Sequence, residues 1–358
     1  MAEIEQYRVL YTQKDLPVFQ NRMYDLESEA RSCPTGDIVL VEDQETGLVY
    51  NIAFESARMD YDDHYQNEQA CSPLFRSHLE NVSSIIQRTM GKTGLVEVGC
   101  GKGYFLEMLL ENGFDLTGFD PAYEGDNPRI LRQYFQPDAG MRADGMILRH
   151  VLEHIENPYD FLTKLRDANG GAGKIFIEVP CFDWICQRRA WFDIFYEHVN
   201  YFRLSDLQRM FGDVIECGRF FGDQYLYLVA DIATLKKPVI NESDRVTFPV
   251  DMMHGQLGRL DMSGVAQNRA AIWGGASKGV IFSLLLERMG RALMMVVDIN
   301  PVKQGRYLPV TGVRVSSPKE AMETLPHGST VYVMNSNYLE EIRVMTSNKY
   351  KYIGVDGV

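Results

Sequence analysis

The sequence has few cysteines and no long apolar run. Its six cysteines are scattered over 358 residues without any CxxC pair, so neither a disulfide framework nor a zinc site of paired cysteines is expected. The apolar stretches fall far short of the roughly 20 residues that a membrane-spanning helix needs. The N-terminal residues carry acids where a signal peptide needs basic residues. We therefore expect a cytoplasmic protein without a bound metal.

Basic residues are also in deficit. The chain has 36 Lys and Arg against 49 Asp and Glu, a net charge of −13. Nucleic-acid binders usually carry a basic patch that neutralises phosphates, so nucleic acid is not the expected partner. Apolar residues make up 45% and charged residues 24%, as in globular proteins with a hydrophobic core. These proportions favour a small-molecule partner and leave the oligomeric state open.

The chain divides into three regions and a connector. Strand-like runs alternate with helical patterns in the middle and C-terminal regions, which predicts parallel βαβ units. The predicted boundaries are a small N-terminal domain at 1–73, an α/β domain at 74–235, a polar connector at 236–268 and a second α/β domain at 269–358.

A glycine loop opens the middle region. The apolar strand 95–98 runs into Gly99, Gly101 and Gly103, and a helical pattern follows. The next strand ends in Asp120, 21 residues after Gly99. In such a unit the glycines let a ligand approach the backbone, and the acid hydrogen-bonds ribose hydroxyls. The alternatives are a dinucleotide site and a turn without a ligand.

The residue order EVGCGKG distinguishes between cofactors. Glu97 stands two residues before Gly99, where a carboxylate attracts a ligand ammonium and repels a phosphate. The motif resembles the first motif of class I methyltransferases. That resemblance implies a doubly wound sheet that binds S-adenosylmethionine, with the loop holding the methionine part.

Two later segments are similar to the same fold. LRHVLEHIENP follows a strand that ends near His150, which we expect to flank the cofactor. A metal site at His150, Glu153 and His154 is the alternative, without the HExxH spacing. Phe135, which follows the third strand, is the predicted adenine contact.

The segment YEHVNYF follows the fifth strand. Glu197 and His198 lie there among aromatic residues, at the sheet edge where open α/β folds place substrates. An acid beside a histidine can form a base whose pKa is tuned by burial. The alternative is an aromatic core with a hydrogen-bonded histidine.

Together with IWGGASKG and VVDINPVKQGRYLPVTG, these motifs resemble a three-domain family of sugar C-methyltransferases that act on nucleotide-linked keto-sugars. The resemblance covers about 280 residues, from Leu74 onward. It implies that His198 is the catalytic base, with Glu197 beside it.

The chain departs from that family at two places. The N-terminal region lacks the family's zinc module of CxxC pairs, so a shorter or rebuilt first domain without zinc is expected. Phe195 stands where the family has a tyrosine, which leaves Tyr196 as a candidate to stabilise an enolate. Tyr61 and Tyr65 are the nearest match to a tyrosine that the family's first domain lends to the substrate site.

A second glycine loop, AAIWGGASKGV, opens the C-terminal region. By the resemblance, this domain is Rossmann-like and faces the nucleotide part of the substrate without holding a nicotinamide. Backbone amides from Gly275 through Ser277 to Lys278 suit a diphosphate at a helix N-terminus, and Asn335 follows a later strand. Binding of NAD, or of no ligand, remains an alternative.

The leading hypothesis is therefore an S-adenosylmethionine-dependent methyltransferase of carbohydrate biosynthesis that methylates carbon in a nucleotide-activated keto-sugar. The first alternative is O- or N-methylation of another activated saccharide or small metabolite. The second is a non-enzymatic binding subunit.

Overall fold

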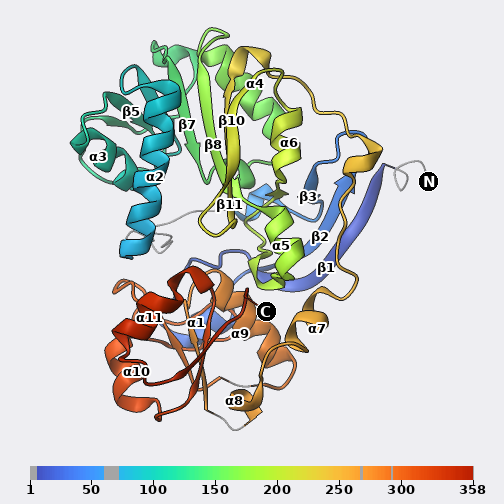
Figure 1. The fold of residues 1–358 in the computed structure, drawn as a ribbon, viewed down its shortest axis with the longest axis vertical. Coiled ribbons are helices and arrows are strands. Elements are labelled where there is room, and N and C mark those ends of the chain that lie inside the picture. The colour runs from blue at the N-terminus through green and yellow to red at the C-terminus, as the bar shows by residue number, and fades with distance from the viewer. Residues whose placement is uncertain (1–5, 60–71, 267–268, 292, 358) are drawn as a thin grey trace.

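The computed structural model describes residues 6–59, 72–266, 269–291 and 293–357. Within these residues the strands form three sheets. The sheet of the middle region lies in the upper half of Figure 1, that of the C-terminal region lies in the lower half, and the N-terminal strands lie along the right side. Tyr61 and Tyr65 lie outside the described residues. No described helix has both the length and the apolar character needed to cross a bilayer.

The middle region forms a seven-stranded sheet in the order β10-β11-β8-β7-β4-β5-β6. The five strands from β8 to β6 are parallel, and β11 and β10 are antiparallel additions at one edge. The strands are β4 (Leu95–Val98), β5 (Leu116–Phe119), β6 (Ile130–Leu131), β7 (Gly145–Arg149), β8 (Lys174–Pro180), β10 (Val214–Phe220) and β11 (Tyr225–Asp231).

Helices cover both faces of this sheet. The helices are α2 (Pro73–Met90), α3 (Tyr104–Glu111), α4 (Pro158–Ala168), α5 (Phe182–Arg188) and α6 (Leu204–Arg209). Apolar residues of α2 and α3 share one core, while those of α4, α5 and α6 belong to another. Asn157 caps α4 by accepting a hydrogen bond from the Asp160 backbone N–H, with Pro158 at the first helical position. The predicted doubly wound class I fold is confirmed.

The C-terminal region forms a five-stranded sheet in the order β14-β13-β12-β15-β16, parallel throughout. Its strands are β12 (Ala270–Trp273), β13 (Met295–Val297), β14 (Val315–Ser316), β15 (Thr330–Val333) and β16 (Lys351–Gly354), and its helices are α9 (Lys278–Arg288), α10 (Pro318–Thr324) and α11 (Leu339–Met345). The connector contains two short helices, α7 (Met252–Leu257) and α8 (Ser263–Ala266). This arrangement is the predicted Rossmann-like one.

The N-terminal region contributes a four-stranded antiparallel sheet. Its strands are β1 (Tyr7–Pro17), β2 (Thr35–Asp43), β3 (Val49–Asn51) and β9 (Asn200–Tyr201). Strand β9 comes from the YEHVNYF segment, so the first region and the middle domain share one sheet. Between β1 and β2, α1 (Glu27–Arg31) reaches the C-terminal domain, where Val310 donates its backbone N–H to the Ala30 carbonyl. The first region thus contacts both other domains (Figure 1).

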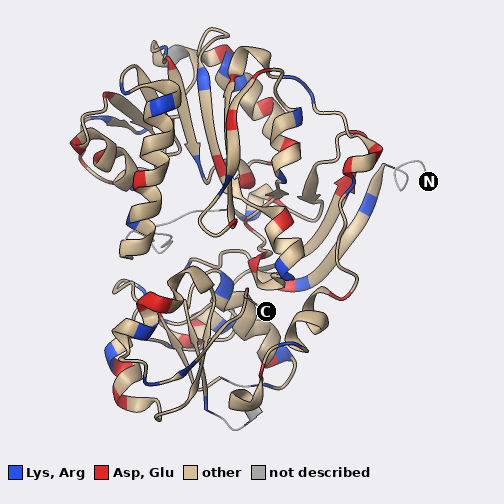
Figure 2. Cartoon of the chain, viewed as in Figure 1, with Lys and Arg blue, Asp and Glu red and all other residues tan. Residues whose placement is uncertain are grey.

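Charged residues of both signs are interspersed over all three regions in the view of Figure 2. The expectation that nucleic acid is not the partner remains a prediction.

Candidate functional site

A cavity of about 380 Å³ lies between the middle and C-terminal domains. It is lined by the glycine loop, the loop after β7, the YEHVNYF segment and the second glycine loop, with Asn21 from the first region. The cavity therefore joins all three described parts of the chain. The residues predicted from the sequence that line it are Glu97, Gly99, Gly101, His150, His198, Ser277, Lys278 and Asn335.

The glycine loop leaves open space at one position. Gly101 has a φ of +55°, and a Cβ built there meets no atom of the described residues within 4 Å, its two chain neighbours aside. At Gly99, with a φ of +74°, a Cβ would lie 2.5 Å from the Val151 Cγ2. Gly99 is thus required by protein packing, whereas Gly101 leaves room for a ligand against the backbone.

Asp120 orders this loop from outside the cavity lining. Its Oδ2 accepts a hydrogen bond from the Gly101 N–H at 2.7 Å, and its Oδ1 accepts one from the Ala122 N–H at 2.9 Å. The predicted contact of Asp120 with a ribose remains a prediction. Gly103, the residue just before α3, has a left-handed backbone conformation and does not line the cavity.

The structure does not place Phe135 where the adenine prediction requires. The adenine prediction requires its ring to be accessible, but the side chain is buried and packs edge-to-face on Phe119 at a centroid distance of 5.0 Å. Phe135 does not line the cavity. It supports the end of β5 from within the core.

Glu97 is a buried acid with an unpaired oxygen. The residue is 3% exposed, and its Oε2 has no hydrogen-bond partner among the described residues. Burial raises the pKa of Glu97 to about 8, against the lowering effect of the nearby Arg149 charge. A cation beside this carboxylate would remove the cost of burying it unpaired. Glu97 and the open space at Gly101 together fit the methionine part of S-adenosylmethionine.

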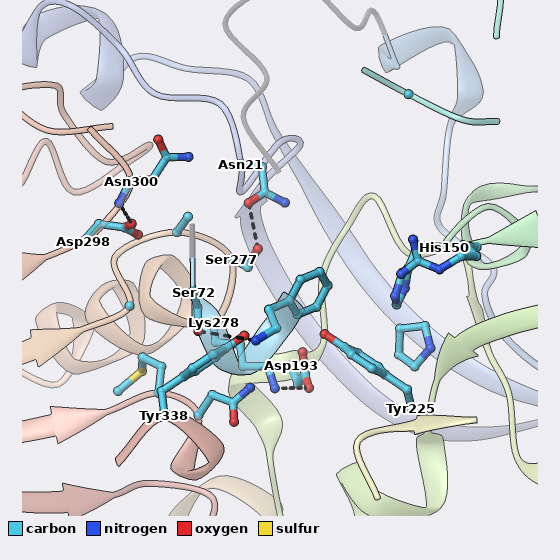
Figure 3. Close-up of a pocket in the computed structure, with 18 of the residues that line it drawn as sticks. Asn21, Ser72, His150, Asp193, Tyr225, Ser277, Lys278, Asp298, Asn300 and Tyr338 are labelled. Carbon is cyan, nitrogen blue, oxygen red and sulfur yellow. Dashed lines mark hydrogen bonds and ion pairs between the residues drawn. The ribbon is translucent and has the colours of Figure 1, made fainter. Parts of the chain in front are cut away.

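His150 sits between two buried acids. Its Nδ1 lies 3.1 Å from the Glu153 Oε1, its Nε2 lies 3.5 Å from the Glu178 Oε1, and its ring packs edge-to-face on Tyr225. Burial lowers the pKa of His150, but the hydrogen bond with Glu153 and the charges of the two acids outweigh this effect and raise that pKa to about 9. His150 is therefore an imidazolium at neutral pH. It lines the cavity (Figure 3).

This placement predicts a pH-dependent stability. The folded-state pKa of His150 exceeds the ordinary value of 6.5, so its stabilisation is complete below pH 6.5 and is lost as the pH rises through about 9. We expect the unfolding midpoint of wild type to fall more steeply than that of His150→Asn over this window. The raised pKa of Glu97 also makes stability fall as the pH rises. This contribution is present in wild type and in His150→Asn, so it cancels when the two proteins are compared. Thermal unfolding from about pH 6 to about pH 10 checks this, and parallel curves would contradict it.

His198 lines the cavity as a neutral imidazole. Its ring packs edge-to-face on Phe195 at 4.9 Å and on His154 at 5.0 Å. Burial lowers the pKa of His198 well below 6.5, and electrostatic interactions with His154, His150 and Lys278 lower it further. The imidazole is thus available to accept a proton.

His154 is held beside this base. Its Nδ1 donates to the Glu197 backbone carbonyl at 2.8 Å, which directs Nε2 away from that carbonyl. Ligand atoms of Glu153, His154 and His198 lie within 4.8 Å of one another. The metal alternative from the sequence groups the first two with His150. The structure instead groups Glu153 and His154 with His198, the predicted base. This arrangement can hold a metal ion but does not require one.

Tyr196 and Glu197 do not reach the cavity, which corrects two predictions. The Tyr196 hydroxyl accepts a hydrogen bond from the Glu55 N–H at 2.9 Å, and its ring packs on Gly36, where a Cβ would lie 2.2 Å away. The Glu197 side chain is fully buried and accepts from the Gln20 N–H at 3.3 Å. Both side chains attach the segment to the N-terminal region. Tyr196 therefore offers no hydroxyl to a ligand beside His198.

The second glycine loop makes contacts within the protein. Lys278 Nζ lies 2.8 Å from the Asp193 Oδ2 and 3.1 Å from the Gln224 Oε1, and it sits over the Trp184 ring. Asn335 exchanges two hydrogen bonds with Gln224, at 2.8 and 2.9 Å. The predicted diphosphate ligand Lys278 is thus already paired with a buried acid.

The neighbouring Ser277 hydroxyl donates to the Asn21 Oδ1 at 2.8 Å. Gly275 lies behind the lining, close to Val296. Figure 3 shows the Lys278–Asp193 pair near the middle of the cavity, with Asp298, Asn300 and Tyr338 to one side and Tyr225 and His150 to the other. Both glycine loops therefore open into one cavity.

Several lining residues are not apparent from the sequence. Asn21, Asp193 and Tyr225 come from a loop, a short 3-10 helix and the start of β11, none of which carries a recognisable motif. Arg149 is visible in the sequence only as the end of a strand. Its position one residue before His150, at the carboxyl edge of a parallel strand, is the signal that could single it out.

Two family models match the chain. Residues 63–214 match the model of a methyltransferase domain, and residues 252–354 match that of a C-methyltransferase C-terminal domain. The second match begins inside the predicted connector. Among curated protein sequences, none matches significantly.

Solved structures resemble about half of the chain. The plantazolicin methyltransferase BpumL in complex with SAH is 16% identical over 46% of this chain and 86% of its own, with a TM-score of 0.36. The N-methyltransferase NodS from Bradyrhizobium japonicum WM9 is 14% identical over 45% and 97%, with a TM-score of 0.32. The PH0226 protein from Pyrococcus horikoshii OT3 is 13% identical over 49% and 100%, with a TM-score of 0.35.

Proposed function

Since the chain is an S-adenosylmethionine-dependent methyltransferase of the class I fold, we propose that it methylates a carbon atom of a nucleotide-activated keto-sugar, with His198 as the base. One observation carries the proposal. His198, a neutral imidazole, lies in the same cavity as the cofactor loop and the loop of the C-methyltransferase C-terminal domain.

The cofactor, when bound, supplies a methyl group on a sulfonium. Residues of the chain bind the cofactor and remove the proton from the substrate. Glu97 faces the cofactor's ammonium, and Gly101 lets its methionine part approach the loop. The imidazole of His198 removes a proton from the carbon beside the substrate ketone. The cofactor held at Glu97 and Gly101 would supply the methyl group to the deprotonated carbon and leave as S-adenosylhomocysteine, and His198 would keep the proton until solvent removes it.

The substrate's nucleotide part is assigned to the C-terminal side of the cavity. Asp298 there is 8% exposed and follows β13, the strand next to β12, as Asp120 follows β5 in the other domain. An acid at this place suits the hydroxyls of a ribose. Ser277, Lys278 and Asn335 are proposed contacts as well. Because Lys278 is paired with Asp193, it would contact a diphosphate while keeping that ion pair.

O- or N-methylation is the second candidate, and one observation favours it. Phe195 lines the cavity against His198 where a C-methyltransferase needs a hydroxyl beside the enolate, and Tyr196 points elsewhere. Tyr61 and Tyr65 remain predicted donors from the first region. An oxygen or nitrogen nucleophile would use the same base without forming an enolate.

Solvent exchange distinguishes the two reactions. Wild-type enzyme is incubated in D₂O with the keto-sugar nucleotide and S-adenosylhomocysteine, which carries no methyl group to transfer. We expect deuterium to appear at the carbon beside the ketone, measured by NMR or mass spectrometry. A substrate that is methylated with S-adenosylmethionine but never exchanges this proton would refute carbon methylation and support the oxygen or nitrogen route.

A further inference from the structure

We propose that Arg149 binds the carboxylate of the cofactor's methionine part, so that Arg149 and Glu97 together recognise an amino-acid zwitterion. The proposal rests on the cofactor and not on the acceptor substrate proposed above. It assigns a ligand to a buried cation that the catalytic scheme leaves unused.

Arg149 lies at the carboxyl end of a strand next to the one that leads into the cofactor loop. It is the last residue of β7, the strand beside β4, and β4 carries Glu97 and leads into the glycine loop. Arg149, Glu97 and Gly101 all line the cavity. The Arg149 side chain is 10% exposed, so a ligand here would meet a guanidinium that is largely shielded from water. Its interaction with a carboxylate is correspondingly strong.

The guanidinium is held in one orientation. Its Nε donates to the Glu178 Oε2 at 2.6 Å, and the other oxygen of Glu178 is 2.7 Å from the His78 Nε2. The guanidinium carbon lies 4.3 Å from the centre of the Phe105 ring. Phe105 belongs to α3, directly after the glycine loop, so the cofactor loop and the cation are packed together.

These contacts leave the two terminal nitrogens of Arg149 for a ligand. Neither of them hydrogen-bonds to another residue within the described ranges. Two terminal nitrogens of a fixed guanidinium can donate in parallel to both oxygens of a carboxylate, a geometry that lysine cannot reproduce.

The charges around Arg149 also match a zwitterion. Arg149 acts on two buried acids, Glu178, which it contacts, and Glu97, whose pKa its charge lowers. A ligand ammonium beside Glu97 and a ligand carboxylate on Arg149 would add one charge of each sign. Each buried charge would then have an opposite partner, which reduces the cost of burying it.

Calorimetry with two ligands tests the proposal. S-adenosylhomocysteine carries the amino-acid group, and 5′-methylthioadenosine has the same adenosine and sulfur without it. For Arg149→Met we expect the Kd of S-adenosylhomocysteine to rise roughly 10- to 100-fold, from the loss of a charge-assisted bidentate pair. The Kd of methylthioadenosine should stay unchanged, which also shows that the variant is folded. Arg149→Lys should restore only part of the affinity.

Arg88→Met is the matched control. Arg88 also pairs through Nε with a glutamate, Glu216, but its side chain is half exposed and lies outside the cavity. The Arg88→Met protein should bind S-adenosylhomocysteine and methylthioadenosine with the affinities of wild type. An Arg149→Met protein that keeps its affinity for S-adenosylhomocysteine would overturn the proposal. If Arg149→Lys and Arg149→Met each lost as much affinity for methylthioadenosine as for S-adenosylhomocysteine, the proposal would also be overturned, because Arg149 would then act only through the fold. A selective loss in Lys102→Met, with none in Arg149→Met, would place the carboxylate on the glycine loop.

Discussion

Replacing His198 with alanine is expected to lower kcat for methyl transfer by roughly 10²- to 10⁴-fold, the usual contribution of a positioned general base. The affinity for S-adenosylhomocysteine should remain that of wild type, because the ring of His198 packs on His154, Phe195 and Tyr201, none of which belongs to the cofactor loop. Steady-state kinetics and calorimetry measure the two quantities separately.

His254→Ala is the control for this experiment. His254 lies in α7, its side chain is 69% exposed, and it does not line the cavity. The control should keep both kcat and cofactor affinity. A His198→Ala enzyme with wild-type kcat would show that positioning alone drives the reaction and would remove His198 from the proposed function.

Replacing Gly101 with valine is expected to weaken binding of S-adenosylhomocysteine by at least about 100-fold, which corresponds to about 2.7 kcal/mol. The added side chain would enter space that no protein atom occupies and that the ligand needs. The positive φ of +55° adds a backbone strain of roughly 1–2 kcal/mol for a residue with a Cβ. Cofactor affinity therefore falls through steric exclusion, and stability falls through strain.

Gly113→Val separates these two effects. Gly113 has a φ of +79°, a Cβ built there also meets no protein atom within 4 Å, and the residue lies beyond the end of α3, outside the cavity. The variant should therefore lose stability by a similar amount and keep the cofactor affinity of wild type. Calorimetry and thermal unfolding of both variants provide the comparison. Equal loss of affinity in the two would mean that strain, rather than the ligand's space, explains the result.

The cofactor loop was predictable from the sequence because its determinants are local. A buried strand, glycines at fixed spacing and a helical pattern form one continuous unit, in which backbone hydrogen bonding and steric limits on φ favour a single geometry. Glu97 and Gly101 line the cavity as that pattern suggests. The alternating strands and helices of the C-terminal domain were predictable for the same reason.

The YEHVNYF segment shows where local reasoning ends. His198 and Phe195, the residue just before the segment, line the cavity, while Tyr196 and Glu197, between them, face the N-terminal region. This part of the segment is irregular and has no period from which a face can be deduced. Which side chains point inward is decided by the pairing of β9 with β3, a contact between residues about 150 positions apart.

The sequence by itself thus determined the α/β organisation and the cofactor loop, because each depends on residues that are neighbours along the chain. The assignment of His198 as the base depends on the family resemblance and stays a prediction. Only the tertiary structure decided that Lys278 is paired with Asp193, that Phe135 is buried in the core and that Arg149 lines the same cavity as Glu97. Ion pairs and burial depend on which strands and domains meet in space, and no periodicity of the chain records those meetings.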